Sequence, residues 1–413
     1  MAELFKSNGK FRLYMMYQTF SGLGGGVFSV FMLLSVHMLY GNPMYTGIAG
    51  FLMTVPFVFS LVVGPIVDRS NKVKIMRYTT FLEFAVLALL AFTPLLEILG
   101  VLFMFAVVFI YSLAALFESP AGRALLPFIV EEDEILQANS LINIAALVGG
   151  VGIAFILFSS VEEGMNLRFV YGISTAFLAI AFAFTCLLRD PSVKEVTADA
   201  PKHHFMSDLI AGMKFVRGSV FFYILTALVS MRVVMEITAT NMPAFAEYHV
   251  GVRGYIIFTI VGLAGGIVAS GIIGRVGSKF KIGYLIAAFL VLRGIARVAF
   301  VYVLPAHYDG GLAILLMFAA LSSCVGILYT TLEQRLPPKS MVGRVDTLTT
   351  TCFSLMGALG ALLGGIVGRL VTNIDNIFIF QGYMYVVVGV LIILIPAVRK
   401  IPKMDDIERG AEE

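Results

Sequence analysis

Long runs of apolar residues recur from one end of the chain to the other, with short polar segments between them. A membrane hydrocarbon core about 30 Å thick is crossed by a helix of about 20 apolar residues. Charged, glycine or proline breaks delimit twelve such runs: 13–38, 46–66, 76–98, 101–121, 138–160, 167–188, 219–241, 253–273, 282–304, 311–332, 347–370 and 377–398. This pattern predicts an all-α membrane protein with twelve transmembrane helices.

One long polar stretch interrupts the series, between the sixth and seventh predicted spans. Its last part, residues 205–216, is amphipathic, as in helices that lie on a membrane surface. We therefore predict an N-terminal six-helix half over residues 1–190 and a cytoplasmic linker over 191–218. A C-terminal six-helix half with a short cytoplasmic tail then occupies residues 219–413.

Lysine and arginine are distributed unevenly between the two sides of these predicted spans. Only Arg168, Arg253 and Arg369 fall in the outer loops, whereas most of the 29 basic residues fall in the tails and the even-numbered loops. Basic residues are enriched in cytoplasmic loops of membrane proteins. The distribution predicts a multi-pass protein of the inner (cytoplasmic) cell membrane with both termini in the cytoplasm.

The amino-acid composition also indicates a membrane protein. Hydrophobic residues make up 59% of the 413 residues and charged residues 13%, and the mean hydropathy is +0.94. Soluble domains carry about a quarter charged residues, so we expect neither a soluble protein nor a nucleic-acid partner. The first apolar run is already long enough to span, and no small-residue cleavage site follows it, so we expect no cleavable signal peptide. The three cysteines lie in apolar runs without CxxC spacing, so we expect no disulfide, metal site or cofactor.

The loop after the second predicted span reads GPIVDRSNKVK, from Gly64 to residue 74. A glycine lets two helices approach closely, and Asp68 can face the positive end of a neighbouring helix. Arg69 and Lys72 suit the anionic inner leaflet. Asn71 stands where a glycine is usual, and asparagine tolerates a left-handed backbone. The loop resembles the signature of the major facilitator superfamily; taken alone it could also be a plain basic turn.

Further stretches carry the same resemblance. Residues 274–281 (GRVGSKFK) form an imperfect second copy, with Ser278 in place of the acid, as expected for two similar halves. Residues 119–127 and 334–345 resemble the connections of macrolide-efflux and enterobactin-exporter-like members. The resemblance covers essentially the whole chain and implies the major facilitator fold with a conformational gate. The expected gate residues are Gly64, Asp68, Arg69, Lys72, Arg123, Gly343 and Arg344.

The sequence departs in two places from the macrolide-efflux and enterobactin-exporter-like members, and both departures bear on proton antiport rather than on transport. Span one carries Gly25 after Ser21-Gly-Leu23-Gly24, where an acid is common, and span five keeps glycines at 149, 150 and 152 without the usual proline. The resemblance also implies that spans one, four, seven and ten line the substrate cavity.

Ionisable residues inside membrane spans are energetically costly and are functional candidates by default. Those found deep inside the predicted spans are Glu83, Arg232, Glu236, Arg293 and Arg297, with Gln18 as a polar candidate in span one. Arg232 and Glu236 are four residues apart and share a helix face, so they form either a coupling or substrate switch or a structural ion pair. We expect Glu236 to be the titrating group, and Glu83 to be a protonated carboxyl bonded to a neighbour.

Arg293 and Arg297 also share one helix face, which predicts a nearby anion, either a substrate group or a lipid headgroup. Snorkelling towards the outer leaflet is the alternative. Glu118 and Glu333, at the inner ends of spans four and ten, predict ion pairs with Arg123 or Arg335.

These observations predict a monomeric secondary transporter, not an enzyme, that exports a small amphiphilic molecule such as a drug or siderophore by alternating access. Protons are the candidate coupling ion, and membrane lipids are expected partners. A lipid or lysophospholipid transporter of the same fold is the alternative reading. A membrane-embedded transferase is less favoured because no paired acidic metal motif is found, and no GxxxxGK[ST] loop indicates direct use of ATP.

Overall fold

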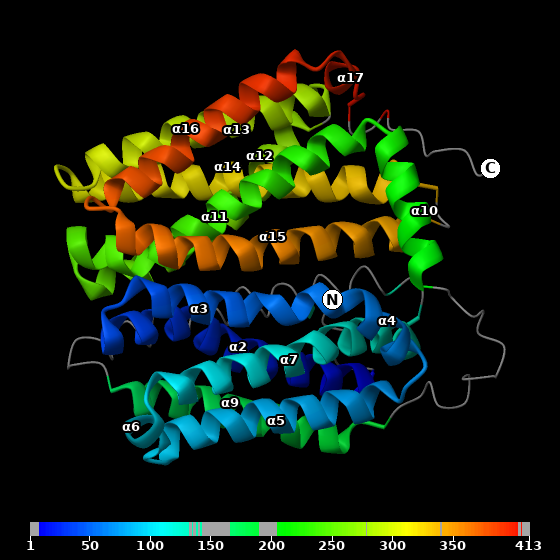
Figure 1. Cartoon of the computed structure of the whole chain (residues 1–413). Coiled ribbons are helices and arrows are strands. Elements are labelled where there is room, and N and C mark those ends of the chain that lie inside the picture. The colour runs from blue at the N-terminus through cyan, green and yellow to red at the C-terminus, as the bar shows by residue number, and fades with distance from the viewer. Residues whose placement is uncertain are drawn as a thin grey trace. The chain divides into compact units, whose positions relative to one another are not determined.

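The computed structural model describes residues 8–131, 134, 138, 141–142, 166–189, 205–277, 279–338, 341–403 and 406. All regular elements among these residues are helices (Figure 1). Ten of the described helices are long and apolar enough to cross a membrane, so the chain is a multi-pass membrane protein.

The ten helices lie where predicted spans one, three, four, six and seven to twelve were expected. They are α2 (Gly9–Tyr40), α5 (Lys72–Phe92), α7 (Val101–Leu125, continued by the 3₁₀ turn η2, Leu126–Phe128), α9 (Leu167–Leu187), α11 (Phe221–Val250), α12 (Val252–Val276), α13 (Ile282–Val303), α14 (Tyr308–Arg335), α15 (Val342–Leu370) and α16 (Asp375–Leu394). The short helix α17 (Pro396–Arg399) follows the last of them.

The second predicted span is not one continuous helix. α3 (Pro43–Thr54) gives way to a 3₁₀ turn, η1 (Val55–Phe59), before α4 (Ser60–Asp68) begins. Pro56 explains the break, because proline lacks a backbone N–H and its ring clashes with the preceding helical turn. The fifth predicted span lies almost entirely outside the described residues, so the count of twelve helices remains a prediction.

Two predicted helix ends were wrong. α5 stops at Phe92, because Pro94 follows and leads into a separate short helix, α6 (Leu95–Leu99). α11 runs to Val250, beyond the predicted end at residue 241. Its last turns carry polar side chains, and backbone hydrogen bonding continues a helix regardless of side-chain polarity.

The chain forms two compact units. The first contains residues 1–41 and 52–203, and the second contains residues 42–51 and 204–413. The change at 203/204 lies within the predicted linker, whereas segment 42–51 was not predicted to leave the N-terminal half. Within the second unit this segment packs closely on α15, because a Cβ at Gly47 would lie 2.7 Å from the Cα of Gly365.

Each unit is held together by lengthwise helix packing. In the first unit α5 packs against α7 and α9, and α2 packs against α9. In the second unit α13 packs against α16 and α14, α11 against α15, and α12 against α14. One close approach is at Gly294 of α13, where an added Cβ would lie 2.4 Å from the carbonyl oxygen of Gly382 on α16. Small residues at such crossings let helix backbones approach closely in membranes.

The amphipathic segment of the predicted linker is a helix, α10 (Phe205–Gly218), and it belongs to the second unit. α10 packs on α15 and α11. Its contact with α15 is close, because a Cβ at Gly212 would lie 3.2 Å from the carbonyl oxygen of Arg344. The end of the predicted linker therefore lies on one of the predicted gate residues.

Candidate functional site

One face of α2 turns a row of polar side chains towards α7 in the first unit. Tyr14 donates its hydroxyl to the carbonyl oxygen of Gly122 at 2.8 Å, and Gln18 donates its side-chain nitrogen to the Tyr14 hydroxyl at 2.6 Å. Residues three and four apart on a helix lie on the same face. This spacing brings Gln18, a predicted candidate, into a network that links the two helices.

The same face of α2 also holds a carboxyl group of α7. Tyr17 and Ser21 both donate their hydroxyls to Oε1 of Glu118, Ser21 at 2.7 Å. The ion pair predicted between Glu118 and Arg123 is absent from the described residues. Five residues correspond to about 140° around a helix at 3.6 residues per turn, so Glu118 and Arg123 do not share a face of α7, and Arg123 is exposed.

In the second unit the predicted pairing on α11 is found. Arg232 and Glu236 form an ion pair between neighbouring helical turns, and their side chains are 30% and 17% exposed. The Nε atom of Arg232 has no hydrogen-bond partner among the described residues. The pair is therefore neither fully buried nor fully solvated, which leaves it able to exchange partners.

Arg293 and Arg297 of α13 are buried, with 7% and 3% of their surface exposed. Arg293 donates to the hydroxyl of Tyr385 at 2.8 Å, and Arg297 donates to the amide oxygen of Gln381 at 2.6 Å. The amide nitrogen of Gln381 in turn donates to the Thr238 hydroxyl of α11 at 2.7 Å. A hydrogen-bonded chain thus joins α13, α16 and α11.

Aromatic rings replace acidic partners around these two arginines. The guanidinium carbons of Arg293 and Arg297 lie 5.0 and 4.6 Å from the ring centre of Phe318, and that of Arg297 lies 4.7 Å from the ring centre of Phe378. In the part of the chain that the structure describes, neither guanidinium forms an ion pair, and each has a buried nitrogen without a hydrogen bond. Snorkelling to the outer leaflet, our alternative expectation, does not hold, because both groups lie among rings inside the unit.

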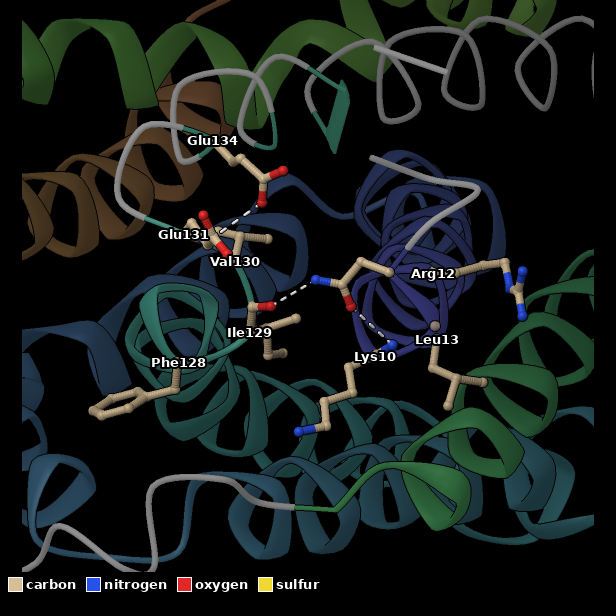
Figure 2. Close-up of a pocket in the computed structure, with 10 residues that line it drawn as sticks. Lys10, Arg12, Leu13, Phe128, Ile129, Val130, Glu131 and Glu134 are labelled. Carbon is tan, nitrogen blue, oxygen red and sulfur yellow. Dashed lines mark hydrogen bonds between the residues drawn. The ribbon is translucent and has the colours of Figure 1, made fainter. Parts of the chain in front are cut away.

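Two pockets open at other places in the described structure. Figure 2 shows one of about 910 Å³ at the start of α2, where Asn8 caps the helix and also donates to the Ile129 carbonyl at 2.8 Å. The charged side chains that line it are Lys10, Arg12, Glu131 and Glu134. Because both signs are present, this pocket does not select ligands by net charge.

The second pocket, of about 770 Å³, lies between α10, α11 and α15 in the second unit. Its walls are mostly apolar, and its basic lining residues, Lys214 and Arg217, both come from α10. An apolar groove beside two cations has the chemistry of a site for an anionic amphiphile.

Similarity to known proteins agrees with these features. Residues 14–361 match the family model described as the Major Facilitator Superfamily. The chain belongs to the Major Facilitator Superfamily. It is 24% identical over 374 residues to Macrolide efflux protein A of Streptococcus pyogenes, covering 87% of this chain and 89% of that protein. It is 25% identical over 413 residues to the Enterobactin exporter EntS of Citrobacter koseri, covering 95% of this chain and 93% of that protein.

Solved structures agree at the level of the fold. The nucleoside transporter NupG superposes with a TM-score of 0.71 at 15% identity, covering 92% of this chain and 98% of that one. A POT family transporter in complex with a thioalcohol-conjugated peptide gives a TM-score of 0.73 at 12% identity, covering 94% and 96%. Members of the Major Facilitator Superfamily are transporters, and the two relatives above carry efflux or export in their names.

The superfamily gate loop is only partly described. α4 ends at Asp68, whose side chain lies outside the described residues, as does Ser278 in the second copy. No described atom lies within 4 Å of a Cβ placed at Gly64, so the close helix approach predicted there is not found among the described residues. Asn71 does not adopt a left-handed backbone (φ −66°); its side chain instead caps α5 by accepting from the backbone N–H of Lys74 at 2.7 Å.

The other predicted gate residues lie near helix ends. Arg69 is exposed, whereas Lys72 is only 5% exposed and lies 5.3 Å from the ring centre of Phe128, so it is not spread on a leaflet surface. Gly343 and Arg344 lie in the first turn of α15. The gate role of all these residues remains a proposal.

Sequence reasoning missed several partners in both units: Tyr17, Ser21 and Tyr111 as neighbours of carboxyl groups, and Gln381 and Tyr385 as neighbours of the arginines. The sequence did contain a signal that could have identified Gln381 and Tyr385. Gln381 and Tyr385 are four residues apart in an otherwise apolar span, and so are Arg293 and Arg297. Each pair therefore lies on one face of its helix with the same spacing, so the two pairs could be matched with each other.

Proposed function

We propose that this chain is a secondary active transporter that exports a small amphiphilic molecule across the cell membrane by alternating access. The superfamily supports transport, and the names of the relatives favour export. The observation that carries the proposal is the partly exposed Arg232–Glu236 pair inside span α11. Charges inside a membrane protein are costly, and they commonly mark substrate or ion pathways.

The pair suits a site that exchanges partners. A charged substrate group can compete with Arg232 for Glu236, or with Glu236 for Arg232, because both are accessible in part. Glu236 remains our first candidate for a titrating group in the second unit. Proton antiport is the coupling we propose.

The buried arginines support a substrate with an anionic or zwitterionic group. Arg293 contacts Met235, the residue before Glu236, with its guanidinium nitrogen 3.8 Å from the sulfur. Arg293 thus contacts α11 one residue before the ion pair, and neither buried arginine forms an ion pair among the described residues. An anion bound here would satisfy the guanidinium nitrogens that have no hydrogen bond. This favours siderophores or lysolipids over cationic macrolides.

A lipid or lysophospholipid transporter is the second candidate. The groove between α10, α11 and α15 favours it, because its walls suit an acyl chain and Lys214 and Arg217 suit a phosphate. In either case we propose a monomer with twelve spans, both termini in the cytoplasm and surrounding lipids as partners. The acidic, basic and aromatic groups described so far suggest binding rather than bond-breaking chemistry.

The test is efflux from vesicles that contain the purified full-length chain. Enterobactin, a macrolide and lysophosphatidylcholine serve as probes, each with and without an imposed pH gradient. We expect enterobactin or lysophosphatidylcholine to move faster than in protein-free vesicles, and the double variant Arg232→Gln/Glu236→Gln to lose this movement. The matched control is Glu97→Gln/Arg168→Gln, which removes an exposed ion pair in the first unit. No movement of any probe by the native chain would end the transport proposal.

A further inference from the structure

Two carboxyl groups meet inside the first unit. Glu83, near the middle of α5, is 2% exposed, and its carboxyl is hydrogen-bonded to the carboxyl of Glu118 on α7. An ionised carboxylate has only acceptor atoms, so a hydrogen bond between two carboxyl groups requires a proton on one of them. The contact therefore implies one bound proton rather than two negative charges.

No positive charge replaces that proton among the described side chains. Arg77, on the same helix as Glu83, donates to the carbonyl oxygen of Thr185 on α9 at 3.0 Å. Arg123, on the same helix as Glu118, is exposed and pairs with neither acid. Two like charges at contact in a low-dielectric interior repel each other, so the pair does not ionise twice without help.

Other helices that pack on this pair bring hydroxyls rather than charges. α2 contributes Tyr17 and Ser21, which donate to one oxygen of Glu118. α9 brings no described charge to the two acids, because its Arg168 lies at the start of the helix and pairs with Glu97. The Asp68 side chain of α4 is not described.

A separate observation indicates that the site has unused hydrogen-bonding capacity. Tyr111 on α7 is 7% exposed and interacts electrostatically with both acids, and its hydroxyl makes no hydrogen bond among the described residues. The second carboxyl oxygen of Glu118, Oε2, is also buried without a donor. A donor and an acceptor that are both unused leave the network able to rearrange when a proton leaves, with Tyr111 available to donate to an ionised carboxyl.

We propose that Glu83 and Glu118 form the proton-binding site of this transporter, with Tyr17, Ser21 and Tyr111 as the groups that stabilise its deprotonated form. In the loaded state one proton is covalently bound to a carboxyl oxygen and shared with the other carboxyl. In the unloaded state that O–H bond is broken, the proton passes to water, and the hydroxyls take up the second negative charge. The inference rests on the proposed function and assigns an acid pair different from Glu236, which has Arg232 beside it.

Infrared spectroscopy of the purified full-length chain tests the site without any substrate. The probe is the carbonyl stretch of a protonated carboxylic acid, which shifts in deuterium oxide. We expect the native chain to show it at neutral pH, and Glu83→Gln and Glu118→Gln each to lose it, because a single proton is shared. Glu97→Gln, at an exposed glutamate of the same unit, is the matched control and should keep it. Absence of the stretch from the native spectrum, or its persistence in both variants, overturns the proposal.

Transport measurements separate this inference from the proposed function. We expect Glu83→Gln to exchange enterobactin across vesicles at equal concentrations but to lose efflux driven by a pH gradient. Gradient-driven efflux at the native rate in both Glu83→Gln and Glu118→Gln overturns the proton site while leaving transport intact. A native chain that shows the infrared stretch but moves no probe contradicts the proposed function instead.

Discussion

Arg293 of α13 binds Tyr385 of α16 in two ways at once, with its guanidinium carbon 4.0 Å from the ring centre and its nitrogen 2.8 Å from the hydroxyl oxygen. The contact combines a cation–π interaction with a charge-assisted hydrogen bond. It lets an arginine remain buried inside a membrane unit without a described carboxylate. The two interactions can be separated by mutation.

Tyr385→Phe keeps the ring and removes the hydroxyl. We expect a loss of about 1–3 kcal/mol in unfolding free energy, because a buried charged donor loses its acceptor. Tyr385→Leu should lose roughly 0.5–2 kcal/mol more through the missing ring. Thermal unfolding in detergent measures both. Tyr383→Phe, on the same helix but 57% exposed, is the control and should leave the melting temperature unchanged.

Close packing of α13 on α16 predicts a steric effect at Gly294. Gly294→Ala places a methyl group against the Gly382 carbonyl oxygen at 2.4 Å and Val386 at 2.7 Å, so the helices must separate. We expect a loss of about 1–3 kcal/mol. Gly262→Ala on α12 meets no atom within 4 Å and should instead gain up to about 1 kcal/mol from its better helix propensity. Equal melting temperatures for the two variants would contradict the packing described here.

The charges of Arg293 and Arg297 should matter for substrate choice if the substrate is anionic. For Arg293→Gln/Arg297→Gln we expect efflux of enterobactin to fall by about tenfold or more relative to a cationic macrolide, because charge-assisted hydrogen bonds contribute roughly 1.5–3 kcal/mol each. Vesicle efflux of both probes side by side measures the ratio. Equal losses for both compounds, or none for either, would remove these arginines from substrate selection.

The exposed pair Glu97–Arg168 predicts a small pH effect on stability. The pKa of Glu97 is lowered by a hydrogen bond from its own backbone N–H and by the Arg168 side chain. A lowered pKa in the folded state stabilises the protein above the unfolded value of about 4.5 and loses this effect as the pH falls through the folded value. Glu97→Gln should therefore melt slightly below the native chain at pH 7, and the difference should vanish in acid. A difference that grows on acidification would contradict this sign.

Asp68→Asn tests the gate loop. We expect the variant to insert and fold but to lose most of its transport, because the signature acid would no longer interact with a helix N-terminus as an anion. Size-exclusion behaviour and melting temperature serve as the folding readout, and vesicle efflux as the functional one. Native transport rates would remove Asp68 from the gate.

Span positions were predictable because hydropathy is averaged over about 20 residues, so a single polar residue does not hide a span. The predicted ends at residues 13 and 38 place the first span inside α2 (Gly9–Tyr40), and those at 282 and 304 nearly match α13 (Ile282–Val303). The break at Pro56 was missed because a 3₁₀ turn of apolar residues has the same hydropathy as an α-helix. Local backbone chemistry, not polarity, decided it.

Partners across helices were harder to predict than the residues themselves. Glu83 was identified as a carboxyl bonded to a neighbour, but the neighbour, Glu118, was assigned to an ion pair on its own helix. Charge pairing along one helix is visible as spacing in the sequence, as for Arg232 and Glu236. Pairing between helices depends on their rotation and axial shift, which no single span encodes.

The interruption at η1 has a mechanical meaning. The boundary between the two units, at residues 51 and 52, falls inside the same span and just before this turn. A rod whose hydrogen-bond ladder is already broken at one point bends there at little further cost. Val55–Phe59 is therefore the point at which this span bends most readily.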